Sequence, residues 1–262
     1  MYEKFTPFIA LVFVSSCQTD KNMPIYQSKA FTLYADKVIQ GANEAQAVST
    51  THIKSTYKSP ASESFSHKEW QLATDVSNRP KYTSQQPIVD ALFNLSLEEA
   101  TKNIEKDSTF RTGAKWGGVW TRDISYSILL AFAYHQPDVA KISLMKKVKR
   151  DRIIQDTGSG GAWPVSSDRT TWALAAWEIY KTTGDKNWLV QAFNIIKNTV
   201  EDDYKTIYDA QTGMYSGESS FLDWREQTYP KWMSNMDIYV SQNLGTNVVH
   251  YQTHKIFSAR SV

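Results

Sequence analysis

The stretch Trp116-Gly117-Gly118-Val119-Trp120-Thr121-Arg122-Asp123 stands directly before an apolar helical pattern. Four apolar residues follow it at the spacing of one helix face: Ile124, Ile128, Leu129 and Phe132. Pro137 then ends the run. The stretch is therefore expected to be a loop that leads into a helix. Its tryptophan rings can stack on sugar rings, and Arg and Asp can form paired hydrogen bonds with neighbouring hydroxyls.

Two further loops combine the same residue types. The first contains Trp163, Asp168 and Arg169, and the second contains Asp223, Trp224, Arg225 and Glu226. Alternate loops of an antiparallel helical array lie at one end, so the three loops are expected to share a face. The alternative interpretation is that Asp123, Asp168 and Asp223 are helix caps or salt-bridge partners.

The composition excludes some classes of protein. The 262 residues are 41% hydrophobic, which is enough for one large domain or two small ones. The net charge is +2, from 29 basic and 27 acidic residues, and this balance argues against a dedicated polyanion binder and so against a nucleic-acid partner. The aromatic content is 13%, with nine Trp and fourteen Tyr. Aromatic faces pack protein cores, and they also stack on sugars, so composition permits a sugar-binding protein.

The N-terminal residues have the pattern of a lipoprotein signal peptide over 1–17. An apolar run over 8–14 is too short to span a bilayer, and the end of the segment, Val14-Ser15-Ser16-Cys17, resembles a bacterial lipobox. Residues 18–29 then read as a tether. We therefore expect export to the cell envelope and a membrane anchor on Cys17. The alternative is an ordinary cleaved signal peptide with an incidental cysteine.

The rest of the chain divides near Pro87. Residues 30–57 predict two or three short strands, a remnant of an N-terminal sandwich, and 58–86 predict a poorly packed connector. The region 87–262 is predicted to be helical, because apolar stripes recur over six ranges: 88–104, 124–132, 139–148, 168–180, 188–200 and 244–256. Asp185 reads as the N-cap of the fifth helix. No strand-like segments separate these helices, so a mainly α protein of helical hairpins is expected.

Three segments of this region resemble one family. Trp120-Thr121-Arg122-Asp123 is similar to a Trp-x-Arg-Asp segment of the six-hairpin glycosidases, the (α/α)6 toroids that include glucoamylases, glycogen-debranching α-glucosidases and trehalases. Asp168–Trp172 with Gly184–Leu189 resembles their helix pair joined by a Thr-Gly-Asp turn, and Ser220–Trp224 resembles the loop of their catalytic acid. The resemblance covers about 87–262.

The resemblance implies an inverting glycoside hydrolase that acts on an α-linked glucoside or a related oligosaccharide. Asp223 would be the general acid, with Glu226 as the competing candidate. By the resemblance, Arg122 and Asp123 would bind the sugar at the cleavage site. The residue types of the three loops add seven further candidates for sugar binding: Trp116, Trp120, Trp163, Asp168, Arg169, Trp224 and Arg225. Inversion needs a second carboxylate roughly 6.5–9.5 Å from the acid to activate water.

The chain departs from the family pattern after Glu226. It has no later Glu, and its only later Asp is Asp237. Six hairpins need twelve helices, whereas the periodicity predicts half that number. The family's catalytic base comes from the later half of the toroid. We therefore expect 87–262 to be the N-terminal half of an (α/α)6 catalytic domain, an incomplete toroid whose activity as a fragment stays an open question.

Two other functions remain open. One is a carbohydrate-binding lipoprotein without chemistry, and the other is a polysaccharide lyase that would use Tyr126, Tyr229 or His135. No metal site is expected, because the spacing of His250 and His254 better fits a surface helix face. No cofactor is expected either, because the glycine-rich segment 158–161 follows no strand and lacks a Gly-Lys-Ser/Thr sequence.

Overall fold

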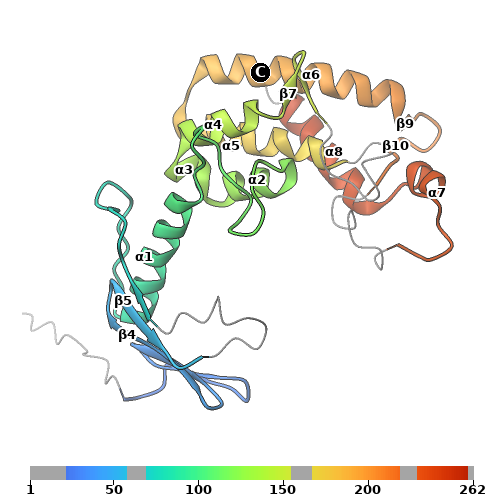
Figure 1. The fold of residues 1–262 in the computed structure, drawn as a ribbon. Helices are drawn as coiled ribbons and strands as arrows, with labels where there is room; N and C mark the ends of the chain where they lie inside the picture. The colour runs from blue at the N-terminus through green and yellow to red at the C-terminus, as the bar shows by residue number, and fades with distance from the viewer. Residues whose placement is uncertain (1–21, 58–68, 155–166, 219–228, 259–262) are drawn as a thin grey trace, which may run out of the picture. The chain divides into compact units, whose positions relative to one another are not determined.

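The computed structural model describes residues 22–57, 69–154, 167–218 and 229–258. These form two compact units, Met1–Glu98 and Glu99–Val262. The first contains an antiparallel sheet and the second is built mainly of helices (Figure 1). The expectation of a helix-rich chain with an N-terminal β segment is confirmed at this level. No helix in the described ranges is both long and apolar enough to span a membrane.

The sheet of the first unit has six strands in sequence order, each antiparallel to the next. Their bounds are β1 Tyr26–Gln27, β2 Thr32–Leu33, β3 Lys37–Gln40, β4 Asn43–Ser49, β5 His52–Ser55 and β6 Glu69–Gln71. The sheet thus extends beyond the two or three strands expected over 30–57. Strand β1 lies in the expected tether, and β6 lies in the expected connector. Both are too short to show an alternating pattern in the sequence.

Helix α1 (Pro87–Lys102) packs on this sheet. Ile88 and Ala91 form a small core with Ala47 and Ile53. The carboxylate of Glu98 is buried, so it needs hydrogen-bond donors. It accepts hydrogen bonds from the Trp70 indole (2.7 Å) and from the backbone N–H groups of Ala73 and Thr74 (2.9 Å each). The boundary between the units therefore lies at Glu98, not near Pro87, and residues after β6 are fixed on α1.

The helical unit is arranged around α5. Its elements are α2 Thr121–Ser127, the π-helix η2 Ile128–Phe132, α3 Ala133–His135, α4 Pro137–Met145, the 3-10 helix η3 Ser167–Thr170, α5 Thr171–Thr183, α6 Lys186–Thr206, α7 Asn235–Val240 and α8 Leu244–Ser258. Helix α5 contacts α2, α3, α4, α6 and α8 (Figure 1). Trp172 of α5 is fully buried and donates its indole N–H to the Leu144 carbonyl at 2.9 Å.

The pair α5–α6 follows the sequence expectation closely. Gly184 ends α5 with φ +65°, a conformation that glycine adopts without steric cost. Asp185 then caps α6 by accepting hydrogen bonds from the backbone N–H groups of Asn187 and Trp188. The predicted N-cap is therefore confirmed, and the Thr-Gly-Asp turn joins two antiparallel neighbours.

Two short hairpins lie between the helices. They are β7 (Val148–Lys149) with β8 (Arg152–Ile153), and β9 (Tyr208–Asp209) with β10 (Met214–Tyr215). The expectation that no strands separate the helices is wrong at these two places. Strands of two residues are too short for an alternating pattern to appear in the sequence.

Candidate functional site

The loop before α2 presents two tryptophans to solvent. The Trp116 side chain is 62% exposed and that of Trp120 is 39% exposed, although large apolar side chains are usually buried. Gly113 and Trp116 exchange two backbone hydrogen bonds of 3.1 Å. Gly118, at φ +75°, turns the chain back so that its carbonyl accepts from Thr112 N–H at 3.1 Å. The exposed rings thus sit on a closed, hydrogen-bonded loop.

Arg111 stabilises this loop by hydrogen bonds to two of its carbonyls. The sequence did not indicate this role. Its Nε donates to the Gly113 carbonyl at 3.0 Å, and its Nη2 donates to the Ala114 carbonyl at 3.1 Å. Glu105 lies 3.6 Å from the same guanidinium. These contacts link the loop to the residues that follow α1, which limits the freedom of the two exposed rings.

Arg122 and Asp123 lie in the first turn of α2 and are partly buried. The N-cap of α2 is Trp120, which makes no side-chain capping bond, so Asp123 is not the helix cap. Within the described part of the chain, the Asp123 carboxylate forms no hydrogen bond or ion pair. Asp123 lies three residues after Trp120, whose ring is exposed, and within the described ranges its carboxylate is open to a ligand. Lys147 adds a cation there, with Nζ 5.9 Å from the centroid of that ring.

Arg169 lies on η3 and forms an ion pair with Asp203 of α6. The Asp203 side chain is 1% exposed, and that of Arg169 is 15% exposed. Burial lowers the pKa of Arg169, and the charge of Asp202 opposes this shift. The predicted sugar-binding residue therefore also has a structural role. Asp168 lies on the same turn, and only its backbone is described.

A stacked aromatic cluster lies between β10 and α8. The rings of Tyr215 and His250 are parallel within 7°, and their centroids are 3.9 Å apart. The Tyr215 hydroxyl lies 2.6 Å from Nε2 of His254. Burial raises the pKa of Tyr215 to about 12. Burial, followed by the charges of His254 and Arg169, lowers the pKa of His250 to about 3.

The expectation that His250 and His254 lie on a surface helix face is wrong. His250 is buried in the cluster, and His254 is partly buried beside Tyr215. Their spacing by one helical turn puts both on one face of α8, and that face points inward. The tyrosine that covers them is on a distant hairpin, so no local pattern could indicate it.

Helix α8 joins the residues that flank the two other predicted loops. Thr253 donates to the Thr170 carbonyl at 3.3 Å, just after the second loop. Thr246 donates to the carbonyl of buried Glu218 at 3.2 Å, just before the third loop. Helix α2, which follows the first loop, packs against η3. Helix α8 therefore contacts residues that flank the second and third loops, and the common face of the three loops stays a prediction.

Several predicted residues lie outside the described residues. They are Cys17, Trp163, Asp223, Trp224, Arg225 and Glu226. Their predicted roles in lipidation, sugar binding and catalysis stay predictions.

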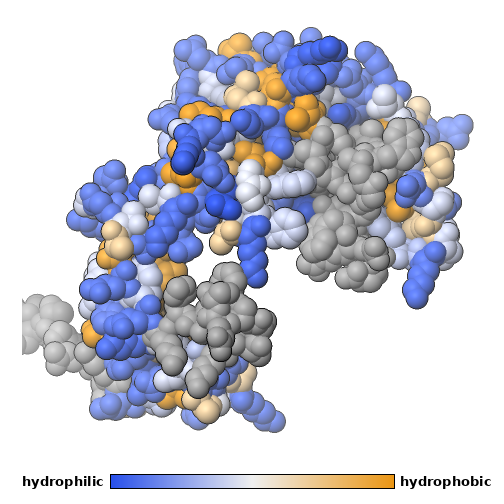
Figure 2. All heavy atoms as spheres, in the orientation of Figure 1, coloured by the Kyte–Doolittle hydropathy of each residue, from blue (hydrophilic) through white to orange (hydrophobic). Residues whose placement is uncertain are grey.

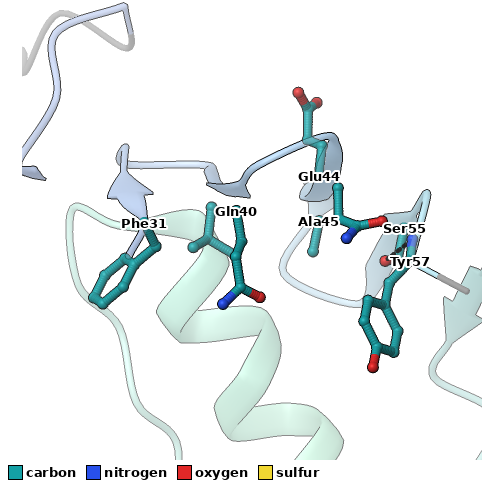
Figure 3. Close-up of a pocket in the computed structure, with 8 residues that line it drawn as sticks. Phe31, Gln40, Glu44, Ala45, Ser55 and Tyr57 are labelled. Carbon is teal, nitrogen blue, oxygen red and sulfur yellow. Dashed lines mark hydrogen bonds between the residues drawn. The ribbon is translucent and has the colours of Figure 1, made fainter. Parts of the chain in front are cut away.

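The first unit has an open pocket of about 340 Å³ on its sheet. Figure 3 shows Phe31, Gln40 and Tyr57 projecting to one side of the sheet and Glu44 to the other. The pocket also includes Ala45, which alternation places on the same face as core residue Ala47. It therefore lies on the sheet face against which α1 packs.

Metal binding finds no support in the described ranges, because they contain no group of three or more His, Cys, Asp or Glu side chains suited to an ion. Comparisons with protein-family models, with curated proteins and with solved structures found no match. Functional inference therefore depends on the residues and their geometry.

Proposed function

We propose that this chain belongs to a glycoside hydrolase that binds an α-linked oligosaccharide at the loop before α2. The observation that supports this most is the exposure of Trp116 and Trp120 on a hydrogen-bonded loop, followed by Asp123, whose carboxylate has no partner among the described residues. Rigid aromatic faces beside hydrogen-bonding side chains are what recognition of a sugar ring requires. Arg122, Asp168 and Arg169 would complete the set of hydroxyl-binding groups.

The proposed chemistry is inversion by two carboxylates. Asp223 would protonate the leaving oxygen, and Glu226 is the alternative acid. Asp237, the only acidic residue after Glu226, is occupied in a capping box at the start of α7. Its carboxylate accepts from the Ser234 N–H and hydroxyl at 2.7 Å each, which lowers its pKa. Asp237 is therefore a capping residue and not the water-activating base.

The proposed architecture is part of an (α/α)6 toroid. Exposed apolar side chains on the first and last helical runs of the second unit support it. Leu130 and Tyr134 are 82% and 71% exposed, and Leu244 and Tyr251 are 80% and 64% exposed. Figure 2 shows apolar residues on the surface of this unit. In a toroid such faces would pack against neighbouring helical hairpins.

A carbohydrate-binding protein without chemistry is the second candidate. Its support is that Asp237, the one acidic residue over 227–262, already caps α7. Both candidates use the same sugar-binding loop, so affinity alone does not separate them. A measurement of product release separates the two candidates.

Hydrolysis is tested with a chain extended to a complete toroid, which is incubated with a panel of α-linked gluco-oligosaccharides while new reducing ends are measured. The rate of hydrolysis should fall by two or more orders of magnitude in Asp223→Asn but not in Glu226→Gln. Loss of hydrolysis in Glu226→Gln alone would assign the role of general acid to Glu226. Binding without product release would favour the second candidate. An ultraviolet-absorbing unsaturated product would instead indicate a lyase.

We also propose that the protein is anchored at the cell envelope through Cys17. The support is the lipobox-like sequence Val14-Ser15-Ser16-Cys17. Cells that express the chain should incorporate labelled palmitate into it, and Cys17→Ala should remove the label. Labelling that persists in Cys17→Ala would rule out this anchor.

A further inference from the structure

The second unit contains an open pocket of about 510 Å³ whose lining is unusually basic. Four of its six lining residues are cationic: Lys149, Arg150, Arg152 and Arg169. The other two, Ile153 and Ile154, continue the same hairpin. The volume is in the range of sites that hold a small ligand. Among the described residues, the lining contains no acidic side chain.

The β7–β8 hairpin places like charges opposite each other. Lys149 pairs directly with Arg152 across the two strands, and Val148 pairs with Ile153. Because Ile153 is buried, alternation puts the two cations together on the opposite face of the hairpin. Like charges directly opposite in a strand pair are destabilising unless an anion lies between them.

The turn of this hairpin has an unusual backbone. Arg150 and Asp151 have φ of +52° and +53°, a region that usually needs glycine or asparagine in a two-residue turn. The Arg150 carbonyl accepts from Arg152 Nη1, and the Asp151 carbonyl accepts from the Asn198 amide, both at 3.1 Å. Such strain persists where the surroundings hold it, and it often occurs at ligand sites.

Only part of the positive charge is compensated. Asp202 lies 2.5 Å from Arg152, and Asp203 pairs with Arg169. The side chains of Lys149 and Arg150 form no ion pair with any described residue. Nε of Arg169 is buried and has no acceptor within the described part of the chain. A buried donor of this kind is costly unless a partner is supplied.

Lys147 connects the basic pocket to the sugar-binding loop. Lys147 stands two residues before Lys149, and its ammonium group is the one above the Trp120 ring. Ile154 N–H donates to the Lys147 carbonyl at 2.9 Å, so Lys147 belongs to the base of the same hairpin. Arg169 lines the pocket and is also a predicted sugar-binding residue.

We propose that this pocket binds the carboxylate or sulfate group of an anionic oligosaccharide, an inference that rests on the proposed function. The sugar rings would lie on Trp120 and Trp116, and the anionic group would be bound by Lys149, Arg150 and Arg169. Charge-assisted hydrogen bonds to an oxyanion are stronger than those to a neutral hydroxyl. The ligand class is therefore an acidic glycan, in preference to a neutral one.

The test compares calorimetric affinities for three ligands: a neutral α-linked gluco-oligosaccharide, the same oligosaccharide carrying sulfate, and inorganic sulfate. The variant is Lys149→Gln with Arg150→Asn, because asparagine tolerates the positive φ of the turn. The control is Lys186→Gln with Lys255→Gln, which removes two exposed lysines from the same unit. Thermal unfolding establishes that both variants fold.

The wild-type chain should bind the sulfated sugar about ten-fold more tightly than the neutral one. The pocket variant should lose this preference and keep its affinity for the neutral sugar, while the control should keep both. An unchanged preference in the pocket variant would overturn the inference. If inorganic sulfate binds as tightly as the sulfated sugar, the pocket takes free oxyanions and the glycan assignment fails. If no sugar binds at all, the proposed function fails, whereas sulfate binding still reports on the pocket.

Discussion

The ring of Tyr215 stacks on the ring of His250, with centroids 3.9 Å apart and planes within 7°. The Tyr215 hydroxyl also contacts Nε2 of His254 at 2.6 Å. Neither ring nitrogen of His250 has a hydrogen-bond partner within the described ranges. Helix α8 is therefore attached to β10 by an aromatic contact that depends on a neutral imidazole.

Acid should weaken the second unit through His250. Its pKa is lowered from 6.5 to about 3, so between these values the unfolded chain binds a proton that the folded chain does not. The free energy of unfolding should therefore fall as the pH falls below 6.5, by about 1.4 kcal/mol per pH unit at most. Urea unfolding at pH 7 and pH 5 measures this change.

His250→Phe is the matched variant, because it keeps a stacked ring and removes the titrating group. Its stability should change less between pH 7 and pH 5 than that of the wild-type chain. Some pH dependence of the stability should remain in this variant, since burial also lowers the pKa of His254. An equal slope in the variant and the wild type would assign the acid sensitivity to other groups.

Removal of one partner from the Arg169–Asp203 ion pair should be strongly destabilising. Asp203→Leu leaves a buried guanidinium without its carboxylate, which should cost about 3–5 kcal/mol in urea unfolding. The double variant Asp203→Leu with Arg169→Met should recover most of the loss, because no buried charge remains. The neighbouring Asp202→Asn is the control, since its pair with Arg152 is far more exposed. Equal losses of stability in Asp203→Leu and Asp202→Asn would contradict the conclusion that burial makes the Arg169–Asp203 pair important.

Glu98 should be essential to the first unit. Glu98→Ala would leave the Trp70 indole and two backbone N–H groups without their acceptor, at a cost of about 3 kcal/mol or more. Glu99→Ala removes the adjacent exposed carboxylate from the same helix and should be nearly neutral. Amide hydrogen exchange in β5 and β6 measures the effect. Unchanged protection in Glu98→Ala would show that these bonds do not hold the unit together.

The sequence could predict the parts of the fold that local patterns determine. Asp185 and Gly184 mark their helix ends by short-range chemistry, so the α5–α6 pair was predictable. The π-helix Ile128–Phe132 was not, because its apolar residues also fit an α-helix. Strands of two residues were not predicted because two residues are too few to show the alternation of buried and exposed side chains.

The candidate site also combines features that local sequence patterns predict with features that only distant contacts create. The exposure of Trp116 and Trp120 agrees with the prediction of a binding loop, which was made from the Gly, Arg and Asp residues beside them. The hydrogen bonds from Arg111 and the stack on His250 were not predictable, since each depends on contacts between residues that no periodic pattern connects. The basic cluster at 146–152 is visible in the sequence, but its assembly with Arg169 of η3 into one pocket became visible only in the folded chain.

The most direct measurement is the calorimetric affinity of the chain for an α-linked gluco-oligosaccharide, with Trp116→Ala and Trp120→Ala as variants. Each variant should lose affinity by about ten-fold, because aromatic contact area dominates such sites. Tyr251→Ala removes an equally exposed aromatic side chain from α8 and should bind as the wild type does. Full affinity in both tryptophan variants, or no binding by the wild-type chain to any α-linked sugar, would contradict the assignment of this loop as the sugar site.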